Sequence, residues 1–269
     1  MSFTPTQAGL HQVFVTFRGK HLQGSPFTLE VVDRPIYHRD YTKVGDQPAS
    51  RFGSQGAGDG QFSGPFSVAC NSRGEIFVAD RNNHRIQVFD RNGQFMFKFG
   101  SEGNGNGQLN RPYGVTVDQR DDQIVVADLS NHRIQIFNSQ GQFVRKFGSG
   151  GEGSGQMKGP FGVGLLSNGN IVVAENGGNR LQIFDSQGNF VRIVGAGQIK
   201  NPGRLFVDSD DNILVVDCGN HRIQVFHQNG NNFKLIGIGQ ISHPTGVCMD
   251  SEGRIIITES LFPCRISIF

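Results

Sequence analysis

A motif of about 14 residues recurs along most of this 269-residue chain and constrains its fold more than any other feature. Each copy joins an apolar run, an acidic residue, a short polar stretch and a segment such as Arg-Ile-Gln-Val-Phe. The copies are residues 76–89 (IFVADRNNHRIQVF), 124–137 (IVVADLSNHRIQIF), 171–184 (IVVAENGGNRLQIF), 213–226 (ILVVDCGNHRIQVF) and, with one inserted residue, 255–269 (IIITESLFPCRISIF). Repetition at this scale predicts one supersecondary unit stacked several times.

A proline precedes every copy and opens a further apolar run. These prolines are Pro65, Pro112, Pro160, Pro202 and Pro244, and they are spaced by 47, 48, 42 and 42 residues. That period is typical of propeller blades. Each unit contains strand a after the proline, strands b and c within the motif, and strand d ending in glycine, as in 143–148. Because the 38 glycines interrupt every helical window, the pattern predicts an all-β propeller with five four-stranded blades.

The two ends of the repeat region predict how the ring closes. The last unit ends on strand c at Phe269, whereas Ser50-Arg51-Phe52-Gly53 matches strand d without strands a to c before it. We therefore expect a propeller over residues 48–269 in which this N-terminal strand d completes the last blade. Such closure would hide two sheet edges.

The first 47 residues follow a different pattern. Residues 10–17 and 27–32 read as two strands, and residues 33–47 are polar and without periodicity, as in a linker. Since two strands alone are marginally stable in water, residues 1–32 are expected to be part of an incomplete sandwich.

The repeated D-x-x-N-H-R-I-Q-V-F units resemble NHL repeats, over residues of about 50–269. Residues 8–11 (AGLH) through 24–27 (GSPF) resemble the C-terminal end of a filamin-type immunoglobulin domain. Filamin followed by NHL resembles the C-terminal half of TRIM-NHL proteins. That resemblance implies a part of a ubiquitin ligase, but the RING, B-box and coiled-coil segments of the family are expected to be absent here, so the chain by itself is not expected to be an enzyme. The family usually has six NHL repeats, and the five counted here are a departure from its pattern.

Propeller geometry places the d–a and b–c loops on one face, called here the top face. Those loops are long and rich in glycine, whereas the bottom loops are plain turns, so a binding site is expected on the top face. The candidate binding residues there are Arg81, His84, Arg111, Tyr113, His132, Lys158, Phe161, Lys200, Arg204 and His221. Phe66, Tyr113 and Phe161 follow the repeat prolines, and they either pack the blade shoulders or offer stacking platforms to unpaired bases.

An acid–arginine pair recurs at every b–c loop. This repetition favours an ion pair that stabilises the b–c turn over a ring of arginines that binds phosphates. The pairs are Asp80/Arg85, Asp128/Arg133, Glu175/Arg180, Asp217/Arg222 and Glu259/Arg265. His84, His132 and His221 lie in three different blades. The ligands of one metal ion lie within a few ångströms of one another, so no shared metal site is expected. No convergent carboxylates suggest catalysis, and no cofactor is expected.

The charge balance leaves two partner classes open. The 25 Lys and Arg residues oppose 23 Asp and Glu residues, which excludes a strongly polybasic nucleic-acid wrapper. One hypothesis is that the top face binds protein substrates or partners for a ubiquitin-ligase assembly. The alternative is that it binds single-stranded or stem-loop RNA and represses messages. Four cysteines without a C-x-x-C pair and the lack of an apolar span favour a cytoplasmic protein without membrane contact.

Overall fold

The structure is a computed structural model that describes residues 9–13, 16–17, 20–21, 27–31, 51–250, 253–260 and 265–269. The chain divides into two compact units, Met1–Gly45 and Asp46–Phe269. Over the described ranges, no helix is long and apolar enough to cross a membrane.

The first unit contains two short antiparallel strand pairs. β1 (Gly9–Val13) pairs with β4 (Phe27–Val31), and β2 (Thr16–Phe17) pairs with β3 (Lys20–His21). Residues 10–13 and 16–17 of the strand expected over residues 10–17 lie in β1 and β2, and residues 14–15 lie outside the described residues. The filamin assignment of residues 1–32 and the linker at 33–47 stay predictions.

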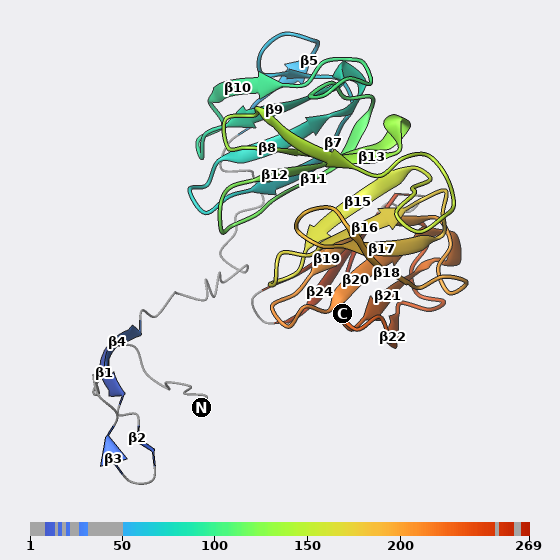
Figure 1. Cartoon of the computed structure of the whole chain (residues 1–269). Helices are drawn as coiled ribbons and strands as arrows, with labels where there is room; N and C mark the ends of the chain where they lie inside the picture. Colours follow the sequence, from blue (N-terminus) through green and yellow to red (C-terminus); the bar gives the residue numbers. More distant parts are fainter. Residues whose placement is uncertain are drawn as a thin grey trace. The chain divides into compact units, whose positions relative to one another are not determined.

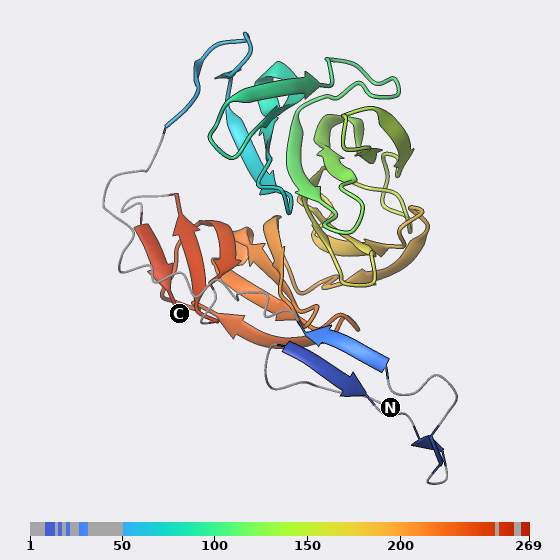
Figure 2. The same ribbon diagram turned by 90° about the vertical axis from the view of Figure 1, so that its left-hand side faces the viewer.

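The second unit contains five antiparallel sheets, the blades of a propeller (Figures 1 and 2), and one short parallel pair of β5 (Ser54–Gln55) and β6 (Gln61–Phe62). Blade 1 consists of β7 (Pro65–Cys70), β8 (Ile76–Asp80), β9 (Arg85–Phe89) and β10 (Phe95–Phe99). Blade 2 consists of β11 (Pro112–Val117), β12 (Ile124–Asp128), β13 (Arg133–Phe137) and β14 (Phe143–Phe147). Blade 3 consists of β15 (Pro160–Leu165), β16 (Ile171–Glu175), β17 (Arg180–Phe184) and β18 (Phe190–Val194).

Blade 4 consists of β19 (Pro202–Val207), β20 (Ile213–Asp217), β21 (Arg222–Phe226) and β22 (Asn232–Ile236). Blade 5 consists of β23 (Pro244–Met249), β24 (Ile255–Glu259) and β25 (Arg265–Ile268). The helical elements of the described chain are three 3-10 turns, η2 (Arg81–Asn83), η3 (Leu129–Asn131) and η4 (Cys218–Asn220). The all-β propeller, its five blades and the assignment of strands a to d in the first four blades are confirmed.

The middle strands of each blade are buried on both faces because neighbouring blades stack on them. In blade 2, every residue of β12 and β13 is buried, whereas β14 alternates between partly buried and exposed positions. Apolar clusters lie between consecutive blades rather than within one; the first joins Phe77 and Phe99 of blade 1 to Val126 and Phe137 of blade 2. A single blade cannot bury these surfaces alone, so the repeats stabilise one another.

One aromatic contact recurs between blades 1 and 2 and between blades 2 and 3, at the end of strand d. The ring of Phe99 lies 4.7 Å from that of Phe137, and the ring of Phe147 lies 4.8 Å from that of Phe184. Phe52 makes the same contact with Phe89, at 4.8 Å. Phe52 thus occupies, against blade 1, the position that the end of strand d occupies against blades 2 and 3.

The predicted closure of the ring by an N-terminal strand d is nevertheless wrong for the described residues. Arg51–Gly53 belong to no strand, and β25 pairs with β24 alone in the described part of the chain. Among the described residues blade 5 therefore has three strands, and its outer residues Ile266 and Ile268 are 66% and 61% exposed. No described residue pairs with the outer edge of β25.

Candidate functional site

On the top face, the b–c loops of blades 1, 2 and 4 have one shape. In blades 1, 2 and 4, a single 3-10 turn follows strand b and ends in a histidine with left-handed backbone: His84, His132 and His221, with φ between 53° and 55°. Asn179 has the same conformation in blade 3, with φ of 51°. Histidine and asparagine tolerate this region better than most residues, which explains their place in the motif.

The acid–arginine pairs are buried structural networks, as predicted. In blade 2, Arg133 Nε donates to Asp128 Oδ2 at 2.7 Å, and its Nη atoms donate to the backbone carbonyls of Asn104, Gly105 and Gln108 in the d–a loop. Pairs of the same kind join Arg85 to Asp80, Arg180 to Glu175 and Arg222 to Asp217 at 2.7–2.8 Å. These arginines therefore shape the glycine-rich loops and are not available to a ligand. The side chain of Arg265, in the fifth pair, lies outside the described residues.

The three histidines join consecutive blades. His84 Nδ1 accepts a hydrogen bond from the backbone N–H of Arg111 at 3.2 Å, and His132 Nδ1 accepts one from Gly159 at 3.1 Å. His221 Nδ1 accepts one from the backbone of His243 at 3.1 Å. The predicted site histidines thus lie on the top face, each directed to the start of the next blade. Within the described residues, no group of three or more His, Cys, Asp or Glu side chains could hold a metal ion.

An aromatic cluster forms where the inner strands of blades 1 to 3 reach the top face. The ring of Tyr113 lies 4.4 Å from Phe66 and 4.6 Å from Phe161, and Phe66 lies 5.1 Å from Phe161. All three side chains are half-buried. The sequence left packing and stacking open as alternatives, and the structure shows that these rings pack on one another.

Two arginines lie over this cluster. The guanidinium carbon of Arg81 is 5.3 Å from the Tyr113 ring centre and 5.8 Å from that of Phe66, and Arg81 Nη1 donates to the Tyr113 hydroxyl at 3.1 Å. Arg204 reaches from blade 4 to blade 1 and places its guanidinium carbon 4.7 Å from the Phe66 ring centre. All three distances are within the range of cation–π attraction.

Arg204 is partly buried. Burial lowers the pKa of its guanidinium, and its Nε atom is buried without a hydrogen-bond partner. Because arginine is not deprotonated in proteins, the group stays charged. Neither Arg81 nor Arg204 forms an ion pair with a carboxylate of the described residues.

The remaining predicted cations lie on the rim of the top face. Lys158 Nζ is paired with Glu152 at 3.0 Å, and both side chains are exposed. Arg111 and Lys200 are exposed and have no carboxylate partner in the described part of the chain. The rim therefore retains uncompensated positive charge.

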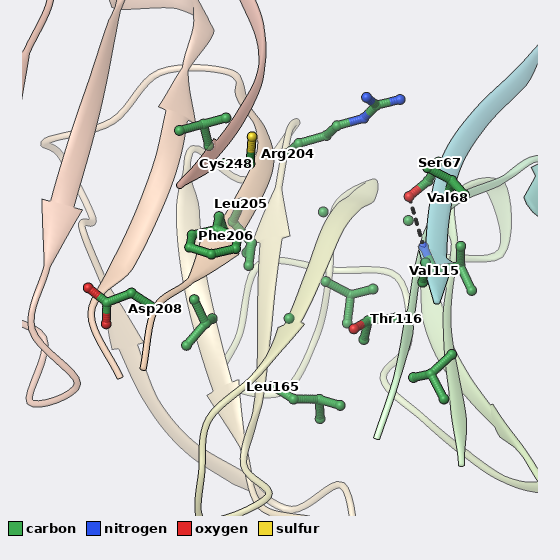
Figure 3. A pocket seen from close by; sticks show the side chains of 18 of the residues that line it. Ser67, Val68, Val115, Thr116, Leu165, Arg204, Leu205, Phe206, Asp208 and Cys248 are labelled. Carbon is green, nitrogen blue, oxygen red and sulfur yellow. Dashed lines mark hydrogen bonds between the residues drawn. The ribbon is translucent and has the colours of Figure 1, made fainter. Parts of the chain in front are cut away.

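A cavity of about 920 Å³ runs along the inner strands of all five blades, beneath the aromatic cluster. Figure 3 shows Ser67 and Val68 of blade 1 facing Arg204, Leu205 and Cys248 across this channel. Its lining is largely aliphatic in the middle, and the acidic residues Asp118, Asp208 and Asp211 line its lower part. The channel walls are strand backbones, so the shape follows from the fold rather than from loops.

Sequence reasoning missed two relationships. It weighed Arg81 and Arg204 as separate loop cations, whereas the structure brings both onto Phe66. It also did not identify the channel. The available signal was the departure from the repeat, because the second residue after the proline is Ser67, Gly114, Gly162 and Gly246 in the other blades but Arg204 in blade 4.

Comparison with known proteins agrees with the repeat pattern. Residues 64–134 match a family model described as a 6-bladed beta-propeller, and residues 200–226 match the NHL repeat. Protein lin-41 of Caenorhabditis elegans is 35% identical over 99 residues, which are 36% of this chain and 8% of that protein. E3 ubiquitin-protein ligase TRIM71 of Rattus norvegicus is 40% identical over 98 residues, 36% of this chain and 11% of that protein.

Solved structures share the fold at low sequence identity. A streptogramin B lyase structure has a TM-score of 0.58 at 16% identity, covering 77% of this chain and 69% of that chain. A virginiamycin B lyase from Staphylococcus aureus has a TM-score of 0.56 over the same shares. The matches to the curated relatives span about a tenth of their length. The repeat region of this chain therefore folds as a β-propeller that contains a match to the NHL repeat, and over about a third of its length the chain is similar to lin-41 and TRIM71.

Proposed function

We propose that the top face of this propeller is a non-catalytic recognition surface that binds protein partners. The supporting observation is that Arg81 and Arg204 lie over the cluster of Phe66, Tyr113 and Phe161. Neither arginine has a carboxylate partner among the described residues. Aromatic and arginine side chains at the centre of a polar rim are typical of binding hot spots.

The proposal extends to the role of the parent protein. One relative is named as an E3 ubiquitin-protein ligase, and this chain matches about a tenth of it. By analogy, the propeller would select the protein that such a ligase modifies, while the transfer chemistry would belong to other segments.

A charge-reversal experiment tests the top face directly. We would screen the full chain against a panel of protein domains by a binding assay, and then compare Arg111→Glu/Lys200→Glu with wild type. The matched control is Arg91→Glu/Lys234→Glu, which changes the net charge equally at exposed positions on a bottom turn and on strand β22. Selective loss in the first variant supports the proposal. Equal binding by all three proteins would contradict a top-face site.

A second candidate function, RNA binding, is favoured by the uncompensated rim charges of Arg111 and Lys200. Against it, the three rings already pack on one another and guanidinium groups cover Phe66, so stacking of unpaired bases would require the cluster to open. Selection from a random RNA pool, followed by titration from about 50 to 200 mM salt, separates the two functions, since phosphate contacts lose affinity steeply over that range.

A further inference from the structure

Strand d forms the outer edge of each of the first four blades, and one position on it departs from the repeat. In blades 1 and 2, the residue of strand d that pairs with the glutamine of strand c is a lysine, Lys98 or Lys146. The same position is Ile193 in blade 3 and Leu235 in blade 4. Lysine on an edge strand discourages the pairing of a further strand, so blades 3 and 4 lack a protection that blades 1 and 2 have.

The edge of blade 4 is the more open of these two. β22 pairs with β21 alone among the described strands, and its first four residues are exposed (Figure 1). In β18 of blade 3, by comparison, the middle residue Arg192 is partly buried. Phe233 and Leu235 are 48% and 37% exposed, and because they are two residues apart they lie on one face of β22. β22 therefore offers an unpaired backbone edge together with an apolar strip.

Phe233 is held in place by its own blade. Its ring stacks on the ring of His227, with the ring centres 4.1 Å apart and the planes at 12°. Asn212 fixes His227 in turn, because its Oδ1 lies within hydrogen-bond distance of His227 Nδ1, at 2.9 Å. An aromatic side chain that is already fixed loses little conformational freedom when a partner binds, and this favours association.

The charge between the two apolar residues indicates what covers this edge. Lys234 is exposed and forms no ion pair with a carboxylate of the described residues. In an antiparallel pair of two copies of β22 centred on this residue, the two lysines would face each other, and like charges directly opposite destabilise a sheet. An acidic side chain in that place would form a cross-strand ion pair instead. The edge therefore matches a partner strand in which acidic and apolar side chains alternate, rather than a second copy of this chain.

We propose that the outer edge of β22 binds an extended segment of a partner protein as a further strand of blade 4. Apolar side chains of the segment pack on Phe233 and Leu235, and an acidic side chain lies opposite Lys234. Addition of a strand to a free sheet edge is a general mode of peptide recognition, in which the backbone gives affinity and alternate side chains give specificity. The site lies on the outer edge of the blade, so it is separate from the top-face surface of the proposed function.

The test uses two peptide libraries that differ only in charge. Each contains segments of about ten residues, long enough to cover the strand, with apolar residues varied at every second position. The positions between are glutamate in one library and lysine in the other, and both libraries are selected on the full chain. We expect the best glutamate peptides to bind at least about tenfold more tightly than their lysine counterparts. Equal binding of the two kinds, or no binding from the glutamate library, would overturn the inference.

Pairing through the backbone has a signature of its own. Alternate residues of a strand direct their N–H groups to opposite edges, so a strand added to β22 uses only every second N–H of the peptide. The best peptide is therefore N-methylated at every second residue, first in one phase and then in the other. One phase should abolish binding while the other retains it. Equal effects of the two methylation patterns would contradict strand addition.

Two matched pairs of variants locate the site. Leu235→Lys introduces the residue that blades 1 and 2 have at the equivalent position, so it is expected to fold and to reduce peptide binding at least about tenfold. Val144→Lys, which changes an exposed residue of β14 by the same charge, should leave binding unchanged. Lys234→Glu should weaken binding of the glutamate peptides and strengthen binding of their lysine counterparts, whereas Lys146→Glu should do neither. If the selected peptide binds Leu235→Lys as tightly as wild type, it does not bind at β22 and the inference is wrong.

Discussion

The backbone N–H of Arg111 donates a hydrogen bond to Nδ1 of His84 at 3.2 Å, so a side chain of blade 1 holds the first residues of blade 2. Asn179 does the same between blades 3 and 4, where its Oδ1 accepts a hydrogen bond from the backbone N–H of Asn201 at 2.7 Å. One small polar acceptor in left-handed conformation is thus sufficient to join two blades. His84 and Arg111 are also candidate binding residues, and that role stays a prediction.

This contact predicts a difference between two substitutions at one position. His84→Asn should fold with nearly wild-type stability, because asparagine provides an acceptor and tolerates the φ of 55°. His84→Ala should lower the free energy of unfolding by about 1–3 kcal/mol, from the lost hydrogen bond and the backbone strain. Urea denaturation measures both. Equal stability of the two variants would show that the hydrogen bond between blades contributes nothing.

Removal of a buried acid should be far more damaging than removal of an exposed one. Asp128 is fully buried and also accepts a hydrogen bond from the backbone N–H of Asn110 at 2.7 Å. Asp128→Ala would leave Arg133 buried without its counter-charge and should cost about 3–5 kcal/mol. The control is Glu152→Gln, whose exposed pair with Lys158 should contribute no measurable stability. Similar denaturation midpoints for the two variants would contradict this account.

Alanine substitutions at two glycines with the same backbone conformation distinguish the cost of backbone strain from the cost of a steric clash. Gly141 has φ of +75°, and a Cβ there would lie 2.5 Å from the Phe99 ring; Gly197 has φ of +73° and open space around it. Gly197→Ala should cost about 1 kcal/mol for the left-handed backbone alone. Gly141→Ala should cost clearly more, because the ring of Phe99 must move away from Phe137. Thermal denaturation measures the stability of both variants. An equal loss of stability would mean that the Phe99 ring moves aside without a cost in free energy.

Asp118 should make the stability of the propeller depend on acidic pH. Its pKa is lowered chiefly by the hydrogen bond from the Arg120 side chain, whose Nε lies 2.8 Å from Asp118 Oδ1. A carboxyl group with a lowered folded-state pKa contributes stability above its unfolded pKa of about 3.9, and this is lost as the pH falls through the folded value. Asp118→Asn should reduce the loss of stability between about pH 5 and 2. Urea denaturation at a series of pH values measures this slope, and a slope equal to that of the wild type would contradict the prediction.

The repeat pattern predicted the fold well because it is local. The apolar run of strand b and the proline before strand a recur in each unit, and the glycine after strand d recurs in the first four, so the units fold by the same short-range rules. The buried acid–arginine pairs were predictable for the same reason, since Asp128 and Arg133 are close in sequence and face each other in the register of β12 and β13.

The closure of the ring was not predictable from the same pattern. The sequence of residues 50–53 matches strand d, and Phe52 does pack on blade 1 as such a strand would. Whether β25 reaches it depends on the rotation between blades, which is set by side-chain packing in every interface and accumulates along the chain. A small difference in each interface decides the outcome, and no local motif records it.

The sequence by itself determined the strands, the blade count and the networks that shape each loop, because those depend on neighbours within one repeat. Only the tertiary structure decided that Arg204 crosses from blade 4 to Phe66 of blade 1, and that Phe66, Tyr113 and Phe161 form one cluster above a channel. These contacts join residues of different repeats, so their distances depend on how the blades are arranged in space rather than on the order of residues along the chain.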